Sequence, residues 1–333
     1  MEYSKILIRA TNWVGDAVMC LPALHAIRER YSRAHIAILA KPWVADLYSS
    51  EDIADQVIPY TASSIAAKWQ TGRELAEHGF DCAILLQNAF EAALLAWLAR
   101  IPNRIGYNRD GRGFLLTCAI PVPKPGEIPP HQRFYYLELL RRAGIIGALP
   151  DRQPSIVRGR VSASAVIGVS PGAAYGTAKR WLPERFAEAA AQLARERGAS
   201  IALFGSKSER ALCEEVAGLL GDVPATNYAG ATSLAEFIDL ASGCELFLTN
   251  DSGAMHIASA LGVPTVAIFG ATDDAATGPA GPLARVVREP VECSPCLLRE
   301  CPIDHRCMTR VSAGRVVAES LELLALNLSG HPH

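Results

Sequence analysis

The sequence contains no uninterrupted apolar run of the ~18–20 residues that a membrane-spanning helix requires. Its first residues, Met-Glu-Tyr-Ser-Lys, lack the basic and apolar regions of a signal peptide and lead directly into a predicted strand. These two absences predict a cytoplasmic protein without a spanning segment.

Two phosphate-binding motifs are also missing. Neither half of the chain carries G-x-G-x-x-G after its first predicted strand, and no P-loop occurs anywhere. The alternation of strands and helices in both halves is compatible with a nicotinamide-dependent enzyme. The missing motif removes the main support for that interpretation.

The chain of 333 residues is too long for one ordinary core, and this length indicates two domains. Charge is divided unevenly between the halves. Residues 1–158 hold 18 Lys and Arg against 15 Asp and Glu, giving +3, and residues 159–333 hold 14 against 19, giving −5. Eight basic and three acidic residues lie between Arg100 and Arg142. That excess suits an anionic partner, although a solvated face is the commoner meaning.

Strand and helix patterns alternate along both halves, which predicts parallel sheets covered by helices. In the first half we expect strands at 5–9, 35–39, 57–58, 82–86, 104–107 and 116–120, and helices at 14–27, 43–50, 64–78, 90–99 and 134–143. In the second half we expect strands at 165–170, 200–204, 246–249 and 264–269, and helices at 184–197, 209–219, 234–241, from about 252 onward, and at 313–326. A linker is predicted from Pro150 to Arg160.

The stretch 246–261 is the centre of the second half. A short apolar strand is followed by Asn250-Asp251-Ser252-Gly253, which supplies turn chemistry and a side-chain cap for a new helix. A helix that begins there directs free N–H groups and its dipole toward an anion such as a phosphate. His256 lies one turn after Ser252 on the same helical face. The plainer alternative is an ordinary capped crossover helix.

Two other loops follow the first strand of each half. Asp16 stands beside Gly15 in a first helical turn, where a carboxylate can act as a general base, although aspartate is also common at helix starts. Lys179 lies in the loop after strand 165–170, where it can neutralise a departing diphosphate without a metal. An exposed loop lysine is, by itself, usually only a solvated charge.

Four of the nine cysteines form a compact cluster with the spacing C-x₂-C-x₄-C-x₅-C. Such clustering indicates either a zinc site or a loop of reduced cysteines packed near the domain junction. The spacing lacks paired C-x₂-C knuckles, which favours the second interpretation, and a cytosolic setting argues against disulfides. The four residues are Cys293, Cys296, Cys301 and Cys307.

Three segments resemble the bacterial lipopolysaccharide heptosyltransferases, glycosyltransferase family 9. They read Ala10-Thr-Asn-Trp-Val-Gly-Asp-Ala-Val, Pro171-Gly-Ala-Ala-Tyr-Gly-Thr-Ala-Lys-Arg-Trp-Leu-Pro183 and Thr249-Asn-Asp-Ser-Gly-Ala-Met-His256. The cysteine-rich segment that begins Cys293-Ser-Pro-Cys shares the resemblance, which covers nearly the whole chain.

This resemblance implies the α/β GT-B architecture, in which two Rossmann-like parallel-sheet domains face a central cleft. It implies an acceptor domain at 1–158, a donor domain at 159–312, and a C-terminal helix and tail at 313–333 near the domain junction. The implied reaction is an inverting, metal-independent transfer of L-glycero-D-manno-heptose from ADP-heptose to the first heptose of the lipopolysaccharide inner core. The acceptor would be a lipid A-core glycolipid at the cytosolic face of the inner membrane, with no cofactor and no nucleic-acid partner.

Residue roles follow from the same resemblance. Asp16 would be the catalytic base, and the donor would be held by Lys179, Asp251, Ser252, Gly253 and His256. For the acceptor we expect Asn12, Arg104, Arg109 and Arg112. Other acceptors within the family, a GT-B sugar-nucleotide epimerase and a non-catalytic solute-binding protein remain alternatives. The last of these would need an export signal.

Overall fold

A computed structural model describes residues 2–49, 51–159 and 165–329. The chain divides into two compact units, residues 1–154 and 155–333. This boundary falls inside the predicted linker, of which residue 160 lies outside the described residues. No helix in the described part of the chain is both long and apolar enough to cross a bilayer.

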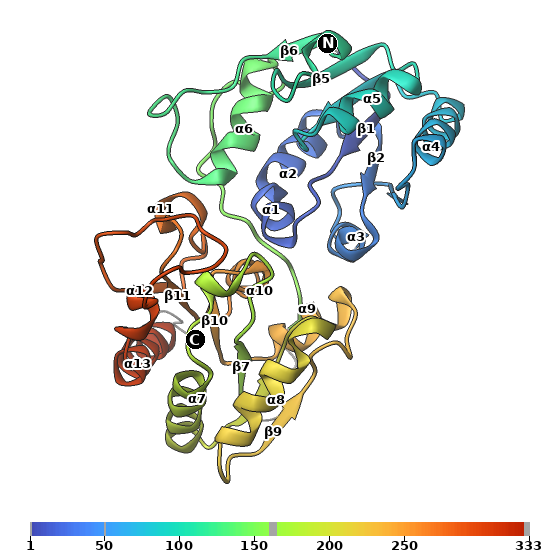
Figure 1. The fold of residues 1–333 in the computed structure, drawn as a ribbon. Helices are drawn as coiled ribbons and strands as arrows, with labels where there is room; N and C mark the ends of the chain where they lie inside the picture. The colour runs from blue at the N-terminus through green and yellow to red at the C-terminus, as the bar shows by residue number, and fades with distance from the viewer. Residues whose placement is uncertain (1, 50, 160–164, 330–333) are drawn as a thin grey trace. The chain divides into compact units, whose positions relative to one another are not determined.

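The first unit is built on a parallel six-stranded sheet with the order β3-β2-β1-β4-β5-β6 (Figure 1). Its central strands are apolar on both sides, as expected for a sheet covered by helices on both faces. The strands are β1 (Lys5–Arg9), β2 (His35–Ala40), β3 (Gln56–Pro59), β4 (Cys82–Leu85), β5 (Asn103–Tyr107) and β6 (Cys118–Ile120).

The helices of this unit pack on the two faces of the sheet, with α4 against α5 and α2 against α6 (Figure 1). Their bounds are α1 (Val14–Met19), α2 (Leu21–Arg30), α3 (Pro42–Ser49), α4 (Ile65–Glu77), α5 (Phe90–Leu98) and α6 (Gln132–Arg142), with a 3-10 turn η1 (Gly113–Leu115). The single helix predicted at 14–27 is two helices that break at Cys20, because Pro22 starts a new first turn.

The second unit repeats this plan, with a parallel sheet in the order β12-β11-β10-β7-β8-β9. Its strands are β7 (Val166–Ser170), β8 (Ser200–Leu203), β9 (Ala225–Asn227), β10 (Leu246–Asn250), β11 (Thr265–Phe269) and β12 (Ala284–Arg288). Strands β9 and β12 were not predicted. β9 is short and mostly exposed and β12 is only partly buried, so neither has the continuous apolar run of a central strand.

Helices of the second unit begin and end at recognisable signals. Helix α7 begins at Pro183 and ends before Gly198, which adopts the left-handed backbone conformation. Ser233 and Glu236 form a capping box at the start of α9. The helices are α7 (Pro183–Arg197), α8 (Arg210–Leu219), α9 (Leu234–Ser242), α10 (Gly253–Ala260), α11 (Asp274–Thr277), α12 (Arg306–Thr309) and α13 (Ala313–Ser329), with 3-10 turns η2 (Thr177–Lys179) and η3 (Lys207–Glu209).

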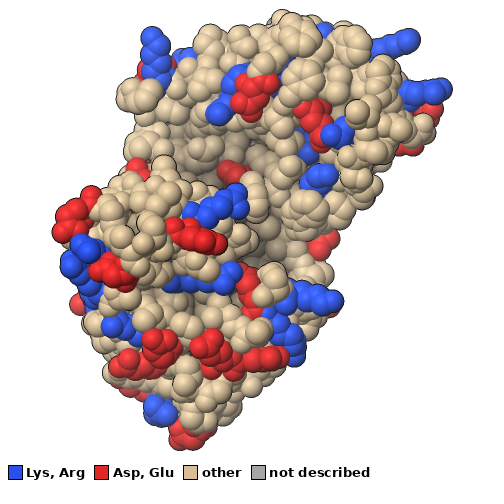
Figure 2. Space-filling view, in the orientation of Figure 1, with Lys and Arg blue, Asp and Glu red and all other residues tan. Residues whose placement is uncertain are grey.

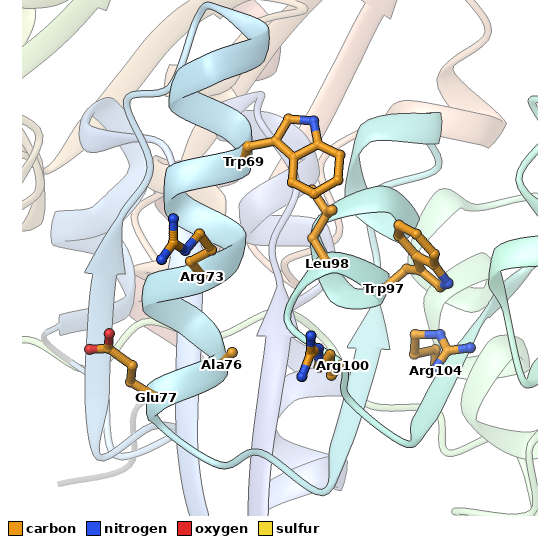
Figure 3. A pocket seen from close by; sticks show the side chains of 8 residues that line it. All are labelled: Trp69, Arg73, Ala76, Glu77, Trp97, Leu98, Arg100 and Arg104. Atoms are coloured by element: carbon orange, nitrogen blue, oxygen red, sulfur yellow. The ribbon is translucent and has the colours of Figure 1, made fainter.

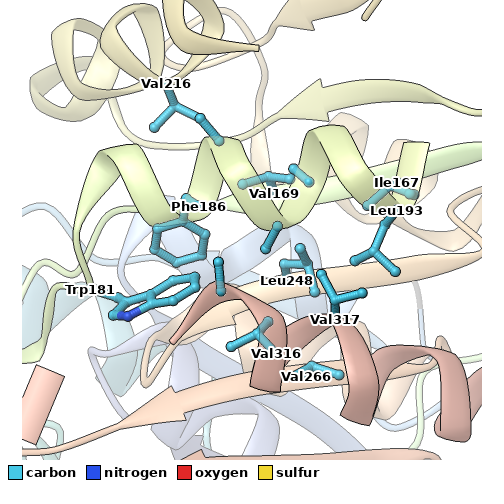
Figure 4. Packing of buried hydrophobic residues seen from close by; sticks show 14 of the residues in the cluster. Ile167, Val169, Trp181, Phe186, Leu193, Val216, Leu248, Val266, Val316 and Val317 are labelled. Carbon is cyan, nitrogen blue, oxygen red and sulfur yellow. The ribbon is translucent and has the colours of Figure 1, made fainter. Parts of the chain in front are cut away.

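The main core of the second unit lies between the sheet and helices α7 and α13 (Figure 4). Trp181 packs edge-on against Phe186 there, and Val316 and Val317 reach the core from α13. The C-terminal helix belongs to the second unit, where it contacts α7, β11 and β12, and its place near the domain junction stays a prediction. Acidic side chains gather on this unit, over the region of α7 and α8 (Figure 2).

Both sheets share one topology. If the strands of each unit are counted from its own first strand, the order is 3-2-1-4-5-6 in both. All strands are parallel, and the side on which successive strands are added to the sheet changes between β1 and β4 in the first unit and between β7 and β10 in the second. Ligands of open α/β sheets bind beyond the carboxyl ends of the strands at such switch points.

Candidate active site

The sequence-predicted site residues follow the switch-point strands. Asp16 comes after β1, Lys179 after β7, and Asp251 directly after β10. The structure therefore places the three loops predicted to bind ligand at the edge where this fold binds ligand.

In the first unit, Asp16 lies in the first turn of α1 and is partly exposed. Its carboxylate Oδ1 accepts a hydrogen bond of 2.9 Å from the hydroxyl of Tyr136 on α6. Burial, and next the charge of Asp16, raise the pKa of Tyr136 well above its usual value, so the phenol stays protonated and keeps donating. Tyr136 is 120 residues away in sequence, and no local motif predicted it.

Two exposed tryptophans lie on the loop that leads into α1 and on α3. Trp13 precedes α1 and is 61% exposed, and Trp43 begins α3 and is 58% exposed. The indole N–H of Trp43 donates to the carbonyl of Asn12 at 2.8 Å, which ties α3 to the loop before α1. The Asn12 side chain, predicted to contact the acceptor, accepts from buried Arg9 at 3.1 Å and so helps to order the loop.

In the second unit, Lys179 is not an exposed loop lysine. Its Nζ lies 2.5 Å from Oδ2 of Asp251, and the hydroxyl of Thr272 donates to the same oxygen at 2.5 Å. Asp251 is only 5% exposed. The carboxylate thus positions the ammonium group across the β7–β10 switch point, and its Oδ2 is already occupied by protein donors.

Asn250 connects the loops on either side of that switch point. It was expected in a turn, but it is the buried last residue of β10. Its Oδ1 accepts from the backbone N–H of Trp181 at 2.9 Å, and its Nδ2 donates to the carbonyl of Pro171 at 2.7 Å. Both ends of the lysine-bearing loop are therefore fastened to one amide side chain.

The predicted side-chain cap of α10 is wrong. Ser252 is the N-cap residue, but no described side chain caps this helix. The Ser252 hydroxyl instead lies 3.2 Å from that of Thr249. The first N–H groups of α10, beginning at partly exposed Gly253, are left for an external acceptor. His256, predicted at the donor, is buried on the same helix.

The cysteine-rich segment supports the Lys179 loop. The carbonyl of Arg299 accepts from the N–H of Ala178 at 3.0 Å, and His305 Nε2 lies 3.0 Å from the carbonyl of the same alanine. Tyr175 donates through its hydroxyl to the carbonyl of Leu297 at 2.7 Å. The ammonium of Lys179 lies 4.7 Å from the centre of the Tyr175 ring.

The four clustered cysteines are free thiols, and Cys307 is buried. No group of three or more His, Cys, Asp or Glu side chains in residues 2–49, 51–159 and 165–329 is arranged to hold a metal ion. The zinc interpretation therefore has no formed ligand set in the structure. The segment does contact and support the loop that carries Lys179.

Three predicted acceptor arginines differ sharply in their surroundings. Arg112 is fully buried and donates to the backbone carbonyls of Tyr107 and Gln87, so it cannot attract a partner from solution as expected. Arg104, on β5, is partly buried and donates to the carbonyls of Ile101 and Leu115. Only Arg109 is exposed, next to Asp110. Charge counting missed this because buried arginines satisfy carbonyls as well as carboxylates.

Two α/β units, each with a parallel six-stranded sheet and polar loops at its switch point, match the GT-B architecture that the resemblance implied. The chain belongs to glycosyltransferase family 9 (heptosyltransferase), whose model matches residues 68–306. This confirms the family predicted from the three sequence motifs.

Named relatives match over most of their length. The chain is 32% identical over 308 residues to the lipopolysaccharide heptosyltransferase 2 of Salmonella typhimurium. This alignment covers 85% of this chain and 88% of the Salmonella protein. The chain is 27% identical over 335 residues to the lipooligosaccharide heptosyltransferase 2 of Campylobacter jejuni, with 96% and 98% covered. The solved structure of E. coli ADP-heptose LPS heptosyltransferase II superposes with a TM-score of 0.84 at 30% identity, covering 97% and 99%.

Proposed function

We propose that the protein is a lipopolysaccharide heptosyltransferase of the second type. It would transfer L-glycero-D-manno-heptose from ADP-heptose to the first heptose of the inner core, with inversion at the anomeric carbon. The observation that carries this proposal is the agreement in name of relatives that align over at least 85% of the chain.

The donor side of the proposed reaction belongs to the second unit. As the bond between the anomeric carbon and ADP breaks, negative charge builds on the leaving diphosphate. Lys179, held by Asp251, and the uncapped start of α10 at Ser252 and Gly253 supply positive charge and N–H donors to meet it. This set supports a transfer without a divalent metal, and activity should therefore survive EDTA. Activity that EDTA abolishes and magnesium restores would contradict that point.

The base belongs to the first unit. The acceptor hydroxyl would attack the anomeric carbon from the face opposite ADP while Asp16 takes its proton. A fixed carboxylate serves this step better than a mobile one, and the bond from Tyr136 supports that role. Exposed Trp13, three residues before the base, and Trp43, which is hydrogen-bonded to Asn12 of the same loop, offer apolar ring surfaces to the acceptor sugars.

The acceptor of such an enzyme is a glycolipid, so we place the protein at the cytosolic face of the inner membrane as a peripheral protein. Its first unit would hold the acceptor and its second unit the donor. Among the basic residues predicted from sequence, Arg109 is the one left exposed for an anionic acceptor.

The test is to incubate the protein with ADP-heptose and a series of defined truncated core acceptors, and to analyse the products by mass spectrometry. Addition of one heptose to an acceptor that ends in a single heptose is the expected result. Addition to an acceptor without heptose would indicate a type I enzyme, and addition only to longer cores a type III enzyme. Conversion of the nucleotide sugar without an acceptor would indicate an epimerase, and binding without any product a solute-binding protein.

A further inference from the structure

Exposed apolar side chains are concentrated on one face of the first unit. Helices α4 and α5 and the adjoining turn η1 carry five large ones, and two of these are tryptophans that are about half exposed, at 52% and 48%. The five are Ile65, Trp69, Phe90, Trp97 and Phe114, and we refer to their surface as the α4–α5 face. Soluble proteins rarely expose a contiguous apolar surface of this kind unless something binds it.

The residues of this face are linked along both helices. Ile65, Trp69 and Arg73 stand four residues apart, which puts them on one side of α4. Phe90 begins α5 and its ring lies 6.2 Å from that of Phe114. The face therefore extends from the carboxyl edge of the sheet, where α5 starts, along the length of the helices.

A groove of about 710 Å³ lies on this face between the two helices (Figure 3). Gly72 of α4 lets α5 approach closely, since a Cβ there would lie 2.5 Å from Cβ of Leu98. Leu98 thus lies between the helices, with the Trp69 ring above it and the Trp97 ring to its right in Figure 3.

Positive charge accompanies these rings. Arg73, Arg100 and Arg104 line the groove, with Glu77 as the acidic residue. Arg104 donates to the carbonyls of Leu115 and Ile101, which anchors it. Arg73 and Arg100 are exposed, and no carboxylate in the described part of the chain pairs with either.

We propose that the α4–α5 face docks on an anionic phospholipid bilayer. Tryptophan rings favour the headgroup level of a membrane, and exposed arginines bind the phosphates of anionic lipids. A site for a small ligand would enclose its aromatic walls, whereas these rings are half exposed. The inference rests on the proposed function only in that a glycolipid acceptor gives the protein a reason to reach the membrane.

The test measures flotation of the full chain with vesicles, without donor or acceptor. Vesicles of phosphatidylcholine mixed with an equal amount of phosphatidylglycerol should bind the protein, and vesicles of phosphatidylcholine alone should bind it far less. The double variant Arg73→Glu/Arg100→Glu should lose roughly tenfold or more in affinity, because each basic residue contributes roughly fivefold near an anionic surface. The matched control is Arg33→Glu/Lys124→Glu, which makes the same charge change at exposed positions outside the face.

A second variant tests the aromatic contribution. Trp69→Ala/Trp97→Ala should keep weak binding at low salt and lose it at high salt, where screening removes the arginine attraction. Thermal melting curves verify that each variant is folded, and the arginine pair remains an independent test if the tryptophan pair unfolds.

The proposal is overturned if the control variant loses as much binding as Arg73→Glu/Arg100→Glu, or if that variant binds like the unchanged protein. Equal binding to both vesicle types would also overturn it. Transfer to a lipid-free soluble acceptor should be unaffected in all of these variants. Absence of heptose transfer by the unchanged protein, with its vesicle binding intact, would count against the proposed function and not against the docking face.

Discussion

The two units share one strand order, yet their tryptophan side chains differ in exposure to solvent. Four of the five tryptophans lie in the first unit, and all four are 48–61% exposed. The fifth, Trp181, lies in the second unit, is 1% exposed, and donates through its indole N–H to the carbonyl of Val311. The same topology thus carries open aromatic surfaces in one unit and a closed polar network in the other.

The polar side chains at the switch points are also more buried in the second unit than in the first. In the second unit, Asn250, Asp251 and Thr272 are buried and fix the Lys179 loop from several sides. In the first unit, Asp16 is partly exposed, and the bond from Tyr136 holds its Oδ1. We infer that one sheet is adapted to a donor of constant shape and the other to a large acceptor.

The largest effect is expected at the first unit's carboxylate. Asp16→Asn keeps the shape of the side chain but cannot take a proton, so transfer should fall by roughly 10²–10⁴-fold. The measurement is the single-turnover rate at saturating donor and acceptor, with exposed Asp52→Asn as the control. A near-normal rate would remove Asp16 from the chemistry.

The next largest effect is expected at the second unit's lysine. Lys179→Ala removes the charge aimed at the diphosphate and leaves buried Asp251 without its cation, so the rate should fall by roughly 10²-fold and the donor KM should rise. Steady-state kinetics with varied donor measures both, and Lys207→Ala is an exposed control. Unchanged constants would show that the ion pair serves folding alone.

Arg112 should matter for stability and not for the acceptor. Burial lowers its pKa to about 10, and Arg112→Gln would leave buried carbonyls without donors. The free energy of unfolding should fall by on the order of 3 kcal/mol. Denaturant unfolding curves measure this free energy. The control is exposed Arg109→Gln, whose free energy of unfolding should stay within about 0.5 kcal/mol of the unchanged protein. A raised acceptor KM at unchanged stability would restore the surface role predicted from sequence.

A smaller effect is expected from Tyr136→Phe, which removes the bond to Asp16 and keeps the ring. One hydrogen bond of this kind orients the base, so kcat should fall by up to about tenfold with both KM values nearly constant. The informative readout is this split between kcat and KM. A rise in the donor KM would instead show that α6 acts on the second unit's ligand.

The sequence predicted every strand except β9 and β12, the positions of the three switch-point loops and the family, because apolar runs, helix starts and loop motifs are local signals. It could not predict that Asn250 closes the lysine-bearing loop or that Tyr136 holds Asp16, since both depend on residues far apart in the chain. It also misjudged Arg112, because a list of charges does not distinguish a buried arginine from an exposed one.

The most direct test of the division between the units is the affinity for ADP, measured by titration calorimetry on Asp16→Asn and Lys179→Ala side by side. We predict that Asp16→Asn binds ADP as tightly as the unchanged protein although it barely transfers heptose. Lys179→Ala should bind ADP at least about tenfold more weakly. Equal losses of ADP affinity in the two variants, or a loss confined to Asp16→Asn, would contradict the account.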